Sequence, residues 1–97
     1  MTAQLNVILG EMAEELHIAE DDLIRKGVQS YLERQLRMVR AEIFEITSRY
    51  NVSSVEVMEE RYRNGSLEEA DTWKDLQRLD HLEYKRDQLQ KYLELLS

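Results

Sequence analysis

One apolar stripe constrains the fold of this chain more than any other feature. Between Leu32 and Tyr50, hydrophobic residues recur in alternating steps of four and three: Leu32, Leu36, Val39, Ile43, Ile46 and Tyr50. This is the heptad spacing of a helix that packs lengthwise against another helix. The chain has no proline, and none of its three glycines interrupts the stripe. The stripe therefore predicts a long helix with a coiled-coil-like seam.

The rest of the sequence extends this prediction to an all-α fold. Amphipathic spacing and the lack of β-branched runs predict helices over about residues 3–17, 20–50, 54–63 and 73–95. Brief connections favour an antiparallel hairpin or bundle of long helices with a short helix in the connection. We expect one domain over residues 1–97, with a helix-turn-long helix (1–50), a short helix and acidic connector (51–72) and a C-terminal helix or arm (73–97).

Local residues mark the expected helix ends. Asn51 tolerates the left-handed conformation that closes a helix. Ser53 precedes Glu56 at capping-box spacing, with Val52 and Val57 placed as a hydrophobic staple. Thr72 is the better of two cap-like residues before the last helix, because an apolar pattern follows it.

The length of the chain favours self-association. A domain of 97 residues buries only about 60–65% of the surface that its unfolded form exposes, and long helices bury less. We therefore expect a homodimer whose interface is the seam of Leu32, Leu36, Val39, Ile43, Ile46 and Tyr50.

Composition limits the classes of partner and cellular location. The net charge of −7 opposes nonspecific binding to nucleic acid or anionic lipid. With no cysteine there is no disulfide framework or thiolate zinc site. No stretch has the length of a membrane span or the pattern of a signal peptide, so a cytoplasmic location is expected.

The reactive residues do not converge on a catalytic or metal site. Glu14 and His17 have the Glu-x-x-His spacing of half a di-iron site, but such a site needs further inward glutamates. Asp80 and His81 are consecutive, so they point in different directions around a helix. We expect a non-enzymatic protein without a cofactor or a bound metal.

Three arginines recur every three residues on the long helix, at Arg34, Arg37 and Arg40. As a nucleic-acid stripe they are weak, because glutamates are interleaved and no aromatic platform accompanies them. A solvated flank is the favoured interpretation. The alternative is that they meet an acidic section of this subunit or another one.

Trp73, Leu76 and Tyr84 are the candidate partner-binding residues of the last helix. Aromatic residues are enriched among binding hot spots. The competing interpretation is that they belong to the protein's own core, and the sequence leaves open whether the last helix packs in cis or in trans. Trp73 is expected to be at least half covered.

Two segments resemble small prokaryotic antitoxin-type proteins. His17-Ile18, Leu23-Ile24-Arg25 and Tyr31-Leu32-Glu33 are similar to the helical part of ribbon-helix-helix antitoxins, and EEADTWKDLQRLDHLEYKRDQLQKYLELL looks like the tail of small helical proteins encoded beside toxins. The resemblance implies dimerisation and a protein partner such as a basic toxin nuclease. Those proteins read DNA with a basic N-terminal strand, whereas this chain begins with the uncharged MTAQLNV.

The charge and the heptad pattern favour an interaction module that dimerises and holds a partner through acidic C-terminal helices. The resemblance implies that this module is antitoxin-like and that it neutralises a partner toxin. The alternatives are a self-contained structural or scaffolding helical bundle and a degenerate DNA-binding transcriptional regulator.

Overall fold

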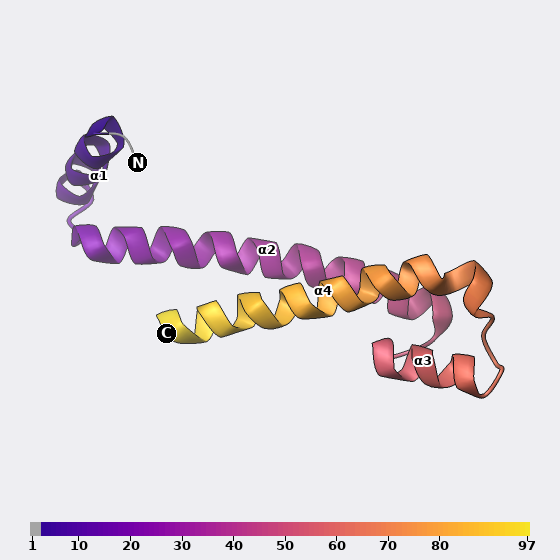
Figure 1. Ribbon diagram of the computed structural model, residues 1–97. Coiled ribbons are helices and arrows are strands. Elements are labelled where there is room, and N and C mark those ends of the chain that lie inside the picture. Colours follow the sequence, from indigo (N-terminus) through magenta and orange to yellow (C-terminus); the bar gives the residue numbers. More distant parts are fainter. Residues whose placement is uncertain (1–2) are drawn as a thin grey trace.

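The computed structural model describes residues 3–97, and this part of the chain is helical without any strand. Its four helices are α1 (Ala3–Glu15), α2 (Glu20–Tyr50), α3 (Val55–Arg63) and α4 (Glu69–Leu96). Figure 1 shows α2 and α4 side by side in opposite directions, with α3 in the connection between them. The molecule is elongated, with extents of 62 × 24 × 17 Å. The predicted all-α hairpin of long helices is confirmed.

The hairpin is held by apolar residues from three helices. Leu36, Val39 and Ile46 of α2 are buried in one cluster with Leu79, Leu82 and Leu89 of α4. Val52 in the connection and Val55 and Met58 of α3 complete it. Met58 and Leu79 have no exposed surface. Removing such apolar surface from water is the dominant favourable term in folding, so this cluster is what keeps α4 against α2.

Polar contacts at both ends of the hairpin fix its alignment. Arg25 Nη1 donates to the backbone oxygen of Leu96 at 2.8 Å, so the end of α4 reaches the second turn of α2. Arg49 pairs with Asp75 at 2.9 Å near the opposite end. The two helices therefore run together over most of their length, while the first turns of α2 extend beyond α4 (Figure 1).

Left-handed residues end two of the helices. Asn51 adopts φ 52° after α2, and the amide of Val52 donates to the Thr47 carbonyl, as in a Schellman motif. The predicted role of Asn51 is confirmed. His17 adopts φ 54° in the same way, with the amide of Ile18 bonded to the Ala13 carbonyl. Because His17 takes this position, α1 ends at Glu15 rather than at His17.

The cap of α3 is Ser54, and the prediction of Ser53 is wrong by one residue. Ser54 Oγ accepts a hydrogen bond from the Val57 amide at 3.3 Å. With Ser54 as the cap, the two staple positions become Ser53 and Met58, so Val52 and Val57 no longer occupy them. Val52 is instead buried with the hairpin core, and Val57 is 37% exposed.

The last helix begins earlier than predicted, at Glu69, and Thr72 is not its cap. Thr72 is buried in the first turn, where its hydroxyl donates to the Glu68 carbonyl at 2.8 Å and lies 2.7 Å from the Tyr62 hydroxyl. The Tyr62 contact ties α3 to α4 and uses the oxygen that a cap needs. The connector between these helices therefore ends at Glu68.

None of the described helices is both long and apolar enough to cross a membrane.

Candidate interaction surfaces

The six predicted dimer residues face α4 of the same chain. Leu36, Val39 and Ile46 are buried, and Leu32, Ile43 and Tyr50 pack against the same cluster. The last helix thus packs in cis in this structure. A second copy reaches these six residues only if α4 moves away, so the use of this seam as a dimer interface stays a prediction.

The three predicted partner-binding residues separate into two groups. Leu76 packs against the hairpin core, whereas Trp73 is 43% exposed and Tyr84 is 65% exposed. The expectation that Trp73 is at least half covered is confirmed. Trp73 and Tyr84 are eleven residues apart, which is about three helical turns. The two aromatic side chains therefore lie on one face of α4.

The aromatic face of α4 also carries carboxylates. Asp80 and Asp87 follow Trp73 by about two and four turns, and both are exposed. We call this surface the α4 outer face, made up of Trp73, Asp80, Tyr84 and Asp87. Rings that stand beside carboxylates suit a cationic partner, because both attract Arg and Lys side chains.

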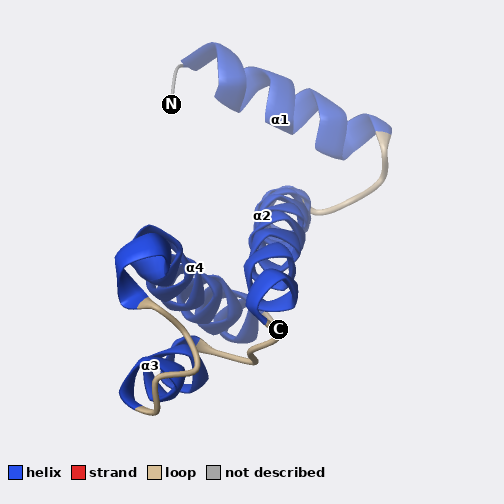
Figure 2. Ribbon diagram, turned by 90° about the vertical axis from the view of Figure 1, so that its right-hand side faces the viewer, coloured by secondary structure: helices blue, strands red, loops and turns tan. Residues whose placement is uncertain are grey.

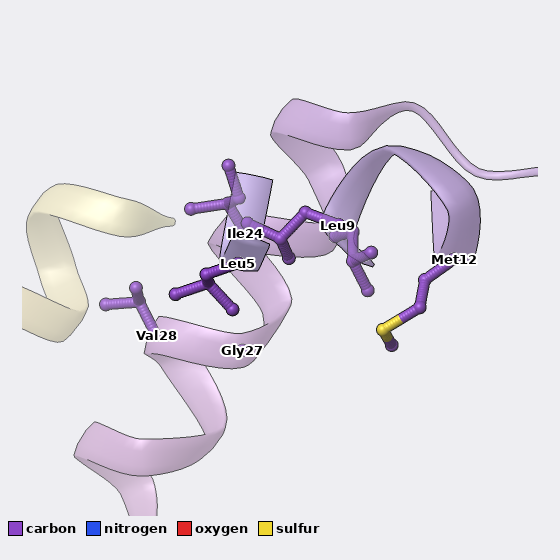
Figure 3. Close-up of a pocket in the computed structure, with 7 residues that line it drawn as sticks. Leu5, Leu9, Met12, Ile24, Gly27 and Val28 are labelled. Atoms are coloured by element: carbon purple, nitrogen blue, oxygen red, sulfur yellow. The ribbon is translucent and has the colours of Figure 1, made fainter. Parts of the chain in front are cut away.

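A second candidate surface lies at the other end of the molecule, where α1 crosses the start of α2. Figure 2 shows α1 set apart from the hairpin and joined to it by a short loop. Between the two helices is an open groove of about 370 Å³, lined by Leu5, Leu9, Met12, Leu23, Ile24, Gly27 and Val28. In Figure 3 the apolar side chains from α1 and α2 converge on this groove. Its lining offers no polar side chain for catalysis.

Much of the apolar surface at this end is uncovered. Among the α1 residues whose burial is described, only Ala13 is buried. Leu5, Ile8 and Met12 are 41–44% exposed, and Leu16 is 62% exposed. Single exposed hydrophobic residues are common on protein surfaces, but a contiguous group marks an interaction site.

The exposed apolar surface continues from the groove along α2. Ile24, Val28, Tyr31 and Met38 are 42–59% exposed and follow one another in steps of four, three and seven. These steps keep them on one face of the helix, next to the seam that α4 covers. We call these four residues the α2 stripe. The heptad spacing of the α2 stripe can be recognised in the sequence. Met38 is hard to assign to it, because this residue lies beside the more regular apolar pattern of the seam.

Two sets of exposed charges make no ion pair within the described part of the chain. One set is acidic and lies on α1 and the start of α2: Glu11, Glu14, Glu15, Glu20, Asp21 and Asp22. The other is Arg34, Arg37 and Arg40. The arginines are therefore solvated in the single chain, as the favoured interpretation predicts.

The titratable residues gather in no metal-binding cluster within the part of the chain that the structure describes. No group of three or more His, Cys, Asp or Glu side chains is placed to hold a metal there. His17 serves as the left-handed residue after α1. Asp80 and His81 are both exposed on α4.

One polar cluster has a perturbed proton affinity. The pKa of Tyr50 is raised above its ordinary value, first by its hydrogen bond to Asp75 and then by burial. Arg49 donates to the same carboxylate. The cluster lies where α2 meets α4, and its hydrogen bonds join the two helices.

The chain belongs to the Uncharacterized protein MJ0235 family, whose model matches residues 1–97. No curated protein and no solved structure matches the chain.

Proposed function

We propose that this family member is a non-enzymatic protein-interaction module of the antitoxin kind. In this proposal it dimerises and neutralises a basic toxin by holding it through its acidic C-terminal helices. The observation that carries the proposal is the α4 outer face, where Trp73 and Tyr84 remain 43% and 65% exposed. Two exposed aromatic residues on one face of a well-packed helix are available to a partner without any rearrangement of the core.

The chemistry of this end of the molecule favours a basic partner. Acidic residues surround the start of α4, in α3, in the connector and in the first turn of α4: Glu56, Glu59, Glu60, Glu68, Glu69 and Asp71. Within residues 3–97, only Glu60 among them forms an ion pair, with Arg63. An uncompensated acidic surface steers cationic partners toward it, and this effect weakens as salt screens the charges. Arg or Lys side chains of the partner then also have the Trp73 and Tyr84 rings to stack on.

The resemblance to antitoxin helices supports the same proposal. It implies a partner protein encoded beside this chain, and the acidic α4 outer face is the surface that such a basic partner would occupy. The net charge of −7 opposes binding to nucleic acid. Protein binding is therefore preferred to the alternative of a degenerate DNA-binding regulator.

Co-expression with the product of the adjacent reading frame tests this function. We expect that product alone to stop growth and this chain to restore it. The double variant Trp73→Ala/Tyr84→Ala should lose the rescue. Tyr92→Ala is the matched control, because Tyr92 is 51% exposed on another face of α4. Growth arrest that this chain leaves unchanged contradicts the proposal.

The second candidate function is a self-contained structural bundle, favoured by the burial of Leu36, Val39 and Ile46 against α4 of the same chain. Fluorescence of Trp73, the only tryptophan, separates the two functions. Binding at the α4 outer face predicts a blue shift and reduced acrylamide quenching when the purified product of the adjacent reading frame is added. Emission that does not change at saturating concentration favours the structural bundle.

A further inference from the structure

We infer that a second copy of this chain covers the α2 stripe, with the two α2 helices antiparallel and the acidic α1 of each copy against Arg34 and Arg37 of the other. This inference rests on the dimerisation in the proposed function and gives it a surface. It differs from the seam predicted from the sequence, which α4 already covers.

The apolar residues at this end lack sufficient cover within one chain. Helix α1 has 13 residues, and an isolated helix of that length is marginal in water. Its stability must come from packing, yet its apolar face is largely exposed. A second copy is produced together with the first, so it is available to cover the apolar face of α1 and to stabilise this helix.

Two residues of the α2 stripe, Ile24 and Met38, are placed symmetrically about Tyr31. Ile24 precedes Tyr31 by seven residues and Met38 follows it by seven, a distance of about 10 Å along the helix in each direction. Two antiparallel copies of α2 centred on Tyr31 therefore place Ile24 of each opposite Met38 of the other. This is the self-complementary contact that a two-fold dimer requires.

Charge complementarity identifies a second copy as the occupant. Helix α1 packs beside residues 23–28 of α2, and pairing about Tyr31 sets this section opposite residues 34–39 of the other copy. Arg34 lies seven residues after Gly27, and Arg37 lies fourteen after Leu23. These spacings put both arginines on the flank of α2 that faces α1. Two charge sets that are unpaired in one chain thus meet in the dimer, whereas a purely basic partner would leave the arginines unpaired.

A charge exchange measured by sedimentation equilibrium tests this arrangement. One variant is Arg34→Glu/Arg37→Glu, and the other is Glu11→Lys/Glu14→Lys/Glu15→Lys. We expect each alone to dimerise at least tenfold more weakly than wild type, because like charges then face each other. A mixture of the two should recover dimers, since every contact between copies again joins opposite charges. Arg40→Glu is the matched control, because Arg40 is off the α1 flank, and it should leave the dissociation constant within twofold.

Several outcomes overturn the inference. These are a monomeric wild type, dimers of both variants at wild-type strength, or a mixture of well-folded variants, judged by circular dichroism, that stays monomeric. If either variant fails to fold, the salt dependence of the wild-type chain tests the inference instead. The dissociation constant of the wild-type dimer must rise as NaCl increases from about 50 to 500 mM, because salt screens exposed ion pairs. A constant or falling value contradicts the inference. The growth assay tests the proposed function separately. If a monomeric chain restores growth, the inferred dimer surface is contradicted, but toxin binding by the α4 outer face is not.

Discussion

The Tyr50 hydroxyl donates a hydrogen bond to Asp75, and Arg49 Nη1 donates to the same carboxylate oxygen at 2.9 Å. Tyr50 is the last residue of α2, and Asp75 is in the second turn of α4. Arg61 of α3 joins this corner by donating to the Tyr50 carbonyl at 2.7 Å. Three helices are therefore tied together where the chain reverses direction.

The Tyr50–Asp75 contact predicts a pH dependence of stability on the alkaline side. Hydrogen bonding to Asp75 and burial raise the pKa of Tyr50. A pKa raised by folding stabilises the protein below the unfolded value of about 10 and loses that effect as pH rises through the folded value. Tyr50→Phe should cost about 1 kcal/mol at neutral pH, and the cost should shrink above pH 10. Urea unfolding at several pH values measures it.

The control for this prediction is Tyr92→Phe, because Tyr92 is 51% exposed on the same pair of helices. It should unfold like the wild type at every pH. A Tyr50→Phe cost that grows above pH 10 contradicts the role given to this contact.

Leu79 is predicted to be the most sensitive leucine of α4. It has no exposed surface, whereas Leu95 on the same helix is 70% exposed. Leu79→Ala should destabilise the chain by about 2–5 kcal/mol, because it removes buried methyl groups and leaves a cavity. Leu95→Ala makes the same chemical change in solvent and should stay within about 0.5 kcal/mol of wild type. Equal losses in thermal unfolding would mean that the hairpin is not packed as described.

Asn51 is predicted to matter through its backbone conformation. Its φ of 52° lies in the left-handed region, which costs most residues roughly 1–2 kcal/mol. Asn51→Ala should therefore lower the free energy of unfolding by about 1 kcal/mol, while Asn51→Gly, which adopts this conformation without strain, should have little effect. Chemical denaturation of the pair checks this ranking, and an alanine variant as stable as the glycine variant refutes it.

The spacing of apolar residues and the residues typical of helix ends were sufficient to predict the helices. The predicted bounds of α2 match its observed range of Glu20–Tyr50. Both ends are determined locally, by the acidic residues of the first turn and by the left-handed Asn51 after the last. Thr72 was misassigned because its hydroxyl is used by Tyr62, a contact between helices. A local pattern contains no information about such a contact.

The candidate surfaces were harder to predict. The heptad seam of α2 identifies residues that need a helix against them, but not which helix supplies the cover. In the structure, Leu79 and Leu82 of the same chain supply it. The α2 stripe stays exposed because α4, which extends as far as Arg25, packs on the neighbouring seam. Which face of α2 is covered follows from the packing of the whole hairpin.

Sedimentation equilibrium of the wild-type chain at micromolar concentration and low salt tests the central claim most directly. Self-association through the α1–α2 end predicts a mass twice that of the 11.6 kDa chain. A single-chain mass across the whole concentration range would contradict it.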